Sequence, residues 1–276
     1  MPTASGGSNQ TCKIGQENRA VLLAMLANRS CLQKAFFKIL TGDAAVPRWE
    51  PHELNLEAFA EPLSREARYW VGFLLADGSI HGKSQYKPAI RLALAVKDYE
   101  HVRKFASFVG IHEEFVHEYK KVSNYGNNDV AWLQFSSAEM CQQLAKYCVV
   151  PNKSGNEVVP DSLALDVDFW RGVIDGDGNV RMRPKDNIPC LTLTGSWKLI
   201  DKFADFLLEI AGKRPAVSQN HSIYQLGIGG SRARATLSKI YYDGCSPVLD
   251  RKMVEAERCK AWLSKYRGEI PREIEV

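Results

Sequence analysis

The sequence lacks the cysteine and histidine patterns of several protein classes. Its seven cysteines are an odd number and none has Cys-x-x-Cys spacing, so neither a complete disulfide framework nor a zinc finger is indicated. His112 and His117 stand one residue too far apart for a zinc-protease helix, which leaves them as expected surface residues. This cysteine usage favours a reducing compartment.

Long apolar runs and a strong charge of one sign are also missing. No segment is long and apolar enough to span a bilayer, and no secretory signal opens the chain. We therefore expect a soluble, intracellular protein with no membrane partner. The sequence leaves the compartment open, with a bacterial cytoplasm and an organelle among the alternatives. The formal net charge is only +4, so a nucleic-acid partner has to be argued from where the basic residues fall.

What the sequence does contain is an internal repeat. The stretch Trp70-Val-Gly-Phe-Leu-Leu-Ala-Asp-Gly78 returns as Trp170-Arg-Gly-Val-Ile-Asp-Gly-Asp-Gly178, one hundred residues later. After each copy come a strand-like segment, a helical run, a second strand-like segment and a second helical run, in the same order. These segments are 90–96, 98–110, 132–135 and a run ending at 147 in the first half, and 190–194, 196–212, 224–228 and a run ending at 242 in the second. The chain therefore holds two similar units.

Small residues recur on one face of both expected helices. Gly72 and Ala76 stand at positions i and i+4, as do Gly172 and Gly176. Residues at this spacing lie above one another on a helix, so each helix has a strip that another backbone can approach closely. We expect the two helices to pack against each other along these strips.

An Asp-Gly pair ends each copy. Gly78 and Gly178 suit left-handed residues that stop a helix, which would leave Asp77 and Asp177 exposed in the last turn where the helices meet. Two carboxylates at helix C-termini lie in a negative local field that favours a divalent cation. Mg²⁺ is the expected ion, because it needs few carboxylates besides water and phosphate oxygens. Taken singly, each copy is as well explained by a buried helix that ends in an ordinary turn.

A calcium-binding loop is the main alternative for the second copy. Asp175, Asp177 and Asn179 have the first three ligand spacings of such a loop. The required glycine would fall on Val180 and the bidentate glutamate on Asp186, so the motif is not completed.

The repeated motifs resemble the signature of the LAGLIDADG homing endonucleases, in the form in which one polypeptide carries two signature helices. The resemblance covers roughly residues 64 to 265. It implies an α+β fold of two pseudo-symmetric αββαββα units, packed through their signature helices, whose antiparallel sheets form a DNA-binding saddle. We expect an N-terminal extension over residues 1–60, partly disordered and then helical, a first repeat over 61–160 and a second over 161–270.

The resemblance also implies an activity. Members of this family make a Mg²⁺-dependent double-strand break at a specific DNA site, as in intron homing, and this chain would do so as a monomer on a long asymmetric duplex. The expected metal ligands are Asp77 and Asp177, with Ala76 and Gly176 beside them in the metal site. Mn²⁺ or Ca²⁺ can replace Mg²⁺ for binding.

A lysine recurs near the end of each repeat. Lys153 lies 76 residues after Asp77, and Lys252 lies 75 residues after Asp177. The resemblance gives both lysines a catalytic role beside the scissile phosphates, where a cation stabilises developing negative charge. Each lysine alone would more readily be interpreted as a solvated side chain.

Polar side chains alternate with apolar ones along the expected strands. A two-stranded ribbon can enter the major groove, where such side chains read base edges or hold phosphates. The alternative is a sheet that simply shows a polar face to water. Because the polar alternation recurs in both repeats, we favour a shared DNA-facing surface. The expected set is Ser79, His81, Lys83, Arg91, Lys97, Gln134, Asn179, Arg181, Arg183, Lys185, Thr192, Thr194 and Gln225.

The strand after each signature helix differs between the repeats. The resemblance implies a polar side chain here that helps to position water. The first repeat offers Ala93 and Ala95 where the second offers Thr192 and Thr194, which leaves open whether the two halves cut equally. The helical pattern over 16–40 lies outside the resemblance and fits a covering helix better than a DNA contact.

Three other functions fit the same residues. A maturase that binds its intron RNA would need the basic saddle but not the aspartates. A sequence-specific DNA-binding protein or regulator that has lost cleavage would not need the metal pair. An intein is disfavoured, because the chain starts with Met1 and ends without the His-Asn pair that splicing requires.

Overall fold

Two sheets of the same topology follow two paired helices. The computed structural model describes residues 54–82, 88–123 and 126–263. In the first half, the helix that carries the first signature is followed by four antiparallel strands in the order β1-β2-β4-β3. The elements of this half are α3 (Arg65–Ala76), β1 (Gly78–His81), β2 (Ala89–Ala95), η2 (Val96–Asp98), α4 (Tyr99–Phe108), η3 (Glu113–Phe115), β3 (His117–Ser123), β4 (Gly126–Ser136) and α5 (Ala138–Lys146).

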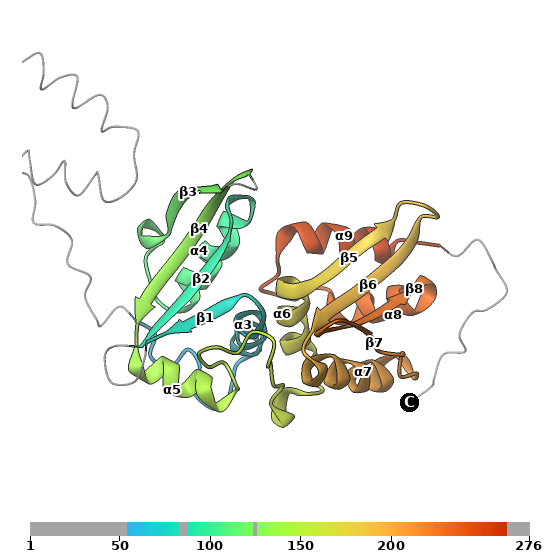
Figure 1. Ribbon diagram of the computed structural model, residues 1–276, viewed down its shortest axis with the longest axis horizontal. Helices are drawn as coiled ribbons and strands as arrows, with labels where there is room; N and C mark the ends of the chain where they lie inside the picture. Colours follow the sequence, from blue (N-terminus) through green and yellow to red (C-terminus); the bar gives the residue numbers. More distant parts are fainter. Residues whose placement is uncertain (1–53, 83–87, 124–125, 264–276) are drawn as a thin grey trace, which may run out of the picture. The chain divides into compact units, whose positions relative to one another are not determined.

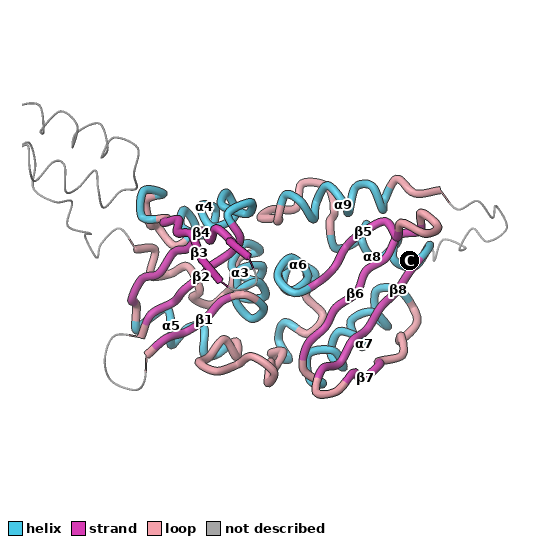
Figure 2. The backbone as a smooth tube through the Cα atoms, turned by 45° about the horizontal axis from the view of Figure 1, so that its top comes forward, coloured by secondary structure: helices cyan, strands magenta, loops and turns pink. Residues whose placement is uncertain are grey.

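The second half repeats this arrangement, with strand order β5-β6-β8-β7. Figures 1 and 2 show α3 and α6 side by side between the two sheets. The predicted α+β fold of two αββαββα units is therefore confirmed, whereas most of the expected N-terminal extension lies outside the described residues. The elements of this half are η4 (Asp161–Leu163), α6 (Val167–Asp177), β5 (Gly178–Arg183), β6 (Ile188–Gly195), α7 (Trp197–Ala211), β7 (Ser218–Asn220), β8 (Ile223–Gly229), α8 (Gly230–Ile240) and α9 (Asp250–Lys260).

Each signature helix begins at a side-chain cap and buries a tryptophan. Ser64 Oγ accepts a hydrogen bond from the Ala67 amide (3.0 Å), as expected for an N-cap, and Asp166 caps α6 in the same way. Trp70 and Trp170 are fully buried at equivalent positions. Both helices are thus fixed at their first turn and anchored in the core of their own half.

The two signature helices touch through their backbones. A Cβ added to Gly72 would lie 2.1 Å from the carbonyl oxygen of Phe169, and one added to Gly172 would lie 2.0 Å from that of Tyr69. At Gly176 an added Cβ would lie 2.4 Å from the Cβ of Ala76. The predicted strip of small residues is therefore the contact surface between α3 and α6.

The glycines that end the signature helices have a different role from the one predicted. Gly178 has extended backbone (φ −77°, ψ 158°), and both Gly78 and Gly178 are the first residues of strands, not left-handed stops. A Cβ at Gly78 would lie 2.8 Å from the carbonyl oxygen of Leu74, and one at Gly178 would lie 2.7 Å from that of Ile174. Glycine fits here because the strand leaves the helix end too tightly for a side chain.

The sheets bury one face, as the alternation predicts. Ile90, Leu92 and Leu94 of β2 are buried, and Leu191 and Leu193 of β6 occupy the same side of the second sheet. Their neighbours in sequence lie on the opposite, open face. Within the described segments, no helix is both long enough and apolar enough to cross a bilayer.

Candidate metal and nucleic-acid site

The two signature aspartates lie at the ends of the paired helices. Asp77 is the residue that follows α3, Asp177 is the last residue of α6, and both are exposed. Asp77 Oδ2 lies 3.5 Å from where a Cβ on Gly176 would stand. The carboxylate of the first half is therefore placed against the end of the second signature helix.

The surroundings of Asp77 and Asp177 disfavour two ionised carboxylates that have no cation between them. Although part of its surface is exposed, the neighbouring protein atoms displace much of the water around Asp77 and raise its pKa, which Lys252 and Lys153 partly oppose. For Asp177, removal from water and then the charge of Asp77 raise the pKa to about 6. Like charges are held close together here, so the site gains most from a ligand that carries positive charge.

Both predicted lysines reach this end from opposite halves of the chain. Lys153 and Lys252 are buried, although a lysine is ordinarily solvated. Lys153 Nζ donates to the carbonyl oxygen of Ala76 (3.1 Å), and Lys252 Nζ donates to that of Gly176 (3.0 Å). Each lysine thus binds the last carbonyls of the signature helix in its own half.

The charges of the four side chains are coupled across the two halves. Burial lowers the pKa of Lys153, and the carboxylate of Asp177 opposes this more than that of Asp77 does. Burial lowers the pKa of Lys252 to about 8, and both aspartates act on it in the opposite sense. Two acids and two bases therefore form one cluster at the ends of α3 and α6.

The donor set fits Mg²⁺ better than a softer or more demanding ion. The aspartates Asp77 and Asp177 offer carboxylate oxygens. In the part of the chain that the structure describes, no group of three His, Cys, Asp or Glu side chains could enclose an ion. Mg²⁺ is commonly held by one or two carboxylates together with water and phosphate oxygens. The carbonyls of Ala76 and Gly176 already accept lysine protons, so the carboxylates are the main candidate ligands.

The open face of the first sheet carries a connected row of polar and aromatic side chains. Arg91 of β2 pairs with Ser79 of β1 on one side and with Gln134 of β4 on the other. Its guanidinium stacks over Trp132, 5.3 Å from the ring centroid, and the ring of His117 lies 5.0 Å beyond. The sequence pattern did not single out Trp132, although it shares strand parity with Gln134.

The open face of the second sheet also carries polar side chains, with threonines on its β6 strand. Asn179 of β5 pairs with Thr192 of β6, and Thr194 pairs with Gln225 of β8. Arg181 is exposed on the same face of β5. His81, the counterpart of Arg181 in the first sheet, accompanies Ser79, whose Oγ lies 2.9 Å from its Nε2.

The strand register changes one predicted correspondence between the halves. Gly78 pairs with Leu92 and Gly178 with Leu193, so the counterpart of Thr194 is Ala93. By the same register Thr192 corresponds to Arg91, not to an alanine. The difference expected between the halves holds at Thr194, but at Thr192 a threonine replaces an arginine.

Four predicted DNA-facing residues need separate comment. Lys97 lies in η2, because the strand ends at Ala95 and the chain turns into α4 there. Lys185 lies in the turn after β5, since the strand ends at Arg183, whose guanidinium is paired with Asp186. Both lysines are exposed but off the strands. Lys83 falls outside the described residues.

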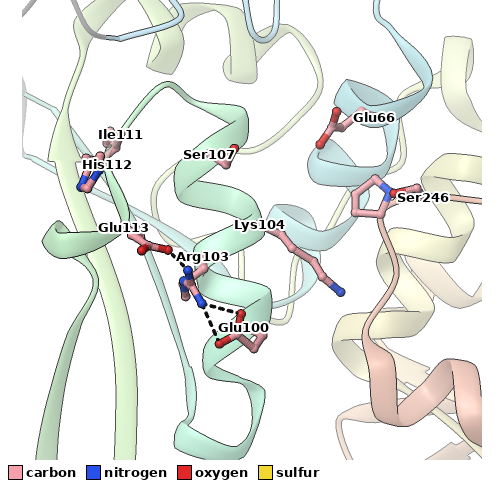
Figure 3. Close-up of a pocket in the computed structure, with 10 residues that line it drawn as sticks. Glu66, Glu100, Arg103, Lys104, Ser107, Ile111, His112, Glu113 and Ser246 are labelled. Atoms are coloured by element: carbon pink, nitrogen blue, oxygen red, sulfur yellow. Dashed lines mark hydrogen bonds and ion pairs between the residues drawn. The ribbon is translucent and has the colours of Figure 1, made fainter.

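A surface pocket of about 590 Å³ lies between α4 and the segment after α8 (Figure 3). Its cations are already engaged: Arg103 pairs with Glu100 and Glu113, and Lys104 donates to Asp250 (2.6 Å). None of the aspartates or strand residues above lines it. This pocket is therefore not part of the candidate site.

The fold, with its paired signature helices that end in aspartates, is the fold of the single-chain LAGLIDADG homing endonucleases. One solved structure with this fold is the homing endonuclease I-WcaI bound to its DNA recognition sequence, at a TM-score of 0.53 and 11% identity, with 75% of this chain and 95% of that chain covered. Two others are the meganuclease I-SmaMI bound to uncleaveable DNA (TM-score 0.47, 13% identity, 70% and 88% covered) and the LAGLIDADG meganuclease I-AabMI bound to uncleaved DNA (0.45, 11%, 72% and 90%). No protein-family model and no curated protein matches the chain.

Proposed function

We propose that the protein is a site-specific endonuclease that cuts both strands of a long, asymmetric DNA duplex with the help of Mg²⁺. The observation that carries this proposal is the cluster of Asp77, Asp177, Lys153 and Lys252 at the ends of two helices in backbone contact. The likeness of the fold to that of I-WcaI, a homing endonuclease bound to DNA, supports the same function.

The aspartates and the lysines of this cluster would have different roles. Asp77 and Asp177 would hold Mg²⁺, which when bound supplies an activated water and neutralises charge on the phosphate. Lys153 and Lys252 keep their ammonium groups fixed beside the aspartates by bonding helix carbonyls. A fixed cation stabilises developing negative charge without having to reorganise during the reaction.

DNA recognition would fall to the open faces of the two sheets. Exposed Gln134, Arg181 and Gln225 are side chains that hydrogen-bond base edges or phosphates. A mismatch at one contacted base pair ordinarily costs about 1 to 3 kcal/mol, so many such contacts give high specificity. With both halves in one chain, a monomer suffices for a two-strand cut.

The test is a selection of cleaved duplexes from a partly randomised library. Wild type, Asp77→Asn and, as a matched control, the exposed and distant Asp205→Asn are compared in Mg²⁺ and in EDTA. We expect wild type and Asp205→Asn to cut a long asymmetric site only with Mg²⁺, and Asp77→Asn to bind that site without cutting. If wild type binds duplex DNA but never cuts, a DNA-binding regulator replaces the nuclease, and preferential binding of structured intron RNA would indicate a maturase.

A further inference from the structure

A third carboxylate near the end of α6 is used by neither the metal site nor the DNA face. Asp175 is fully buried two residues before Asp177. It accepts hydrogen bonds from Tyr69 Oη (2.8 Å), Tyr241 Oη (2.6 Å) and the Leu249 amide (2.8 Å). Three donors on one carboxylate make a strong, fully satisfied buried site that fixes the groups around it.

These three donors come from separate parts of the chain. Tyr69 is on α3 of the first half, Tyr241 directly follows α8, and Leu249 directly precedes α9. Tyr69 Oη also lies 2.9 Å from Nε2 of the buried His101 on α4. Since Tyr69 gives its proton to Asp175, the histidine donates from Nε2. Asp175 therefore ties both halves to the start of α9.

The start of α9 is what carries the second lysine. Leu249 is the N-cap of α9, and its carbonyl accepts from the Lys252 amide (2.8 Å). Lys252 Nζ then donates back to α6, to the carbonyl oxygens of Ile174 (2.7 Å), Asp175 (2.6 Å) and Gly176 (3.0 Å). Asp175 thus binds the backbone at the start of α9. The side chain of Lys252, in the first turn of α9, in turn binds the last carbonyls of α6.

The described residues of the first half hold no carboxylate equivalent to Asp175. Leu75 stands in the place of Asp175 and is buried without polar contacts of its own. Lys153 lies in the loop after α5 and donates to a single carbonyl of α3, that of Ala76. Its loop is held by Glu157, which accepts from the amides of Gly155 (2.7 Å) and, in the second half, Ser196 (3.2 Å). The two lysines are therefore positioned by different means.

We propose that Asp175 is a positioning residue for Lys252, and that its presence in only one repeat makes the two halves of the centre unequal. The part of this inference that concerns the rate of cutting rests on the proposed function. Without the Asp175 carboxylate, the Leu249 amide at the start of α9 loses its bond to α6, and Lys252 is held at the cluster only by its own bonds to the helix carbonyls. One strand would then be cut more slowly than the other.

Asp175→Asn is the central variant. An amide cannot accept from all three donors, because its nitrogen itself donates. With each strand of the duplex labelled separately, we expect the rate for one strand to fall about 10- to 100-fold, as for a displaced catalytic group. We expect the other strand to change less than about threefold, so that nicked duplex accumulates. Equal slowing of both strands would overturn the proposal.

A second readout does not depend on cutting. In the metal-free protein, acetylation of lysines followed by mass spectrometry measures how accessible each amine is. Buried Lys252 should react slowly in wild type and several times faster in Asp175→Asn, whereas exposed Lys239 should not change. If wild type cuts no DNA but Lys252 becomes reactive in the variant, the proposed nuclease function is refuted, whereas the positioning of Lys252 by Asp175 is supported. Unchanged labelling of Lys252 contradicts the positioning whatever the activity.

The matched control is a second buried acid on the same helix. Asp168 accepts from Arg171 Nη1 (2.6 Å) and Tyr242 Oη (2.8 Å) and is not bonded to α9. Asp168→Asn should lose stability but keep the ratio of the two strand rates and the protection of Lys252. Should Asp175→Asn fail to fold, Tyr241→Phe removes one donor only and is expected to give a smaller change of the same kind.

Discussion

Replacing Gly172 with alanine is expected to force the signature helices apart. A Cβ at this position would lie 2.0 Å from the carbonyl oxygen of Tyr69 and 2.7 Å from the amide nitrogen of Phe73. Real Cβ atoms essentially never come within 3.0 Å of another heavy atom, so α6 and α3 must separate by about 1 Å at this point. Both obstacles are backbone atoms, which cannot rotate away as a side chain could.

The sign of the stability change follows from two opposing effects. In the interior of an isolated helix, alanine is more favourable than glycine by about 1 kcal/mol. Overpacking a closely packed core costs about 1 to 3 kcal/mol, and immovable backbone neighbours place this site at the upper end. We therefore expect Gly172→Ala to lower the free energy of unfolding by about 2 kcal/mol. Because the same helices carry Asp77 and Asp177, DNA cutting should fall as well.

Urea denaturation with a constant m-value measures this loss. Gly227→Ala on β8 is the matched control, because the nearest obstacle to its Cβ is the side-chain methyl of Thr192 at 3.0 Å, which can move. We expect that variant to stay within about 1 kcal/mol of wild type, since small shifts relieve the contact. If Gly172→Ala were more stable than wild type, as in an isolated helix, the close backbone contact between α3 and α6 would be refuted.

Two further predictions concern pH. Removal from water and the charge of Asp77 raise the pKa of Asp177 to about 6, so in the metal-free protein Asp177 is mainly protonated at pH 5 and ionised at pH 8. Mg²⁺ must displace that proton at pH 5, so the rise in melting temperature on adding Mg²⁺ should be larger at pH 8, and Asp177→Asn should reduce the difference. Equal shifts at both values of pH would speak against Asp177 as a ligand. Burial lowers the pKa of His101 to about 3, whereas the unfolded chain takes up this proton near pH 6.5. Stability is therefore fully present above pH 6.5 and is lost as the pH falls toward 3, by about 2 to 3 kcal/mol at pH 4.5. Urea denaturation of wild type and His101→Gln at pH 7 and 4.5 checks this, and an equal acid loss in both proteins would contradict it.

Most of the fold was predictable because it depends on local and repeated features. The recurrence of an apolar stretch ending in Asp-Gly, with small residues at i and i+4, was enough to predict two paired helices. Strand alternation identified the buried faces, since side chains on a strand point to opposite sides in turn. Nearly equal spacing from the two aspartates singled out Lys153 and Lys252, and both do reach the ends of the signature helices.

What could not be predicted depends on contacts between distant residues. Gly78 is needed for its close approach to Leu74, which no local pattern distinguishes from a left-handed turn. Trp132 becomes part of the open face only through its stacking with Arg91 on the neighbouring strand. Asp175 looked like a possible ligand next to Asp177, yet its partners, Tyr69 above all, are far away in sequence.

The two halves are alike in their scaffold and unlike in the residues that would meet DNA. Trp70 and Trp170 fill equivalent places, and both helices carry a strip of small residues, because both must pack in the same way. On the open faces no such constraint acts. Arg91 stands where the second half has Thr192, so one sheet offers a long cation stacked on an aromatic ring and the other a short hydroxyl. A palindromic DNA site would present the same bases to both sheets, and only one of the two sheets could bind these bases well. We therefore expect the preferred DNA site to be asymmetric even though the protein that binds it is built from a repeat.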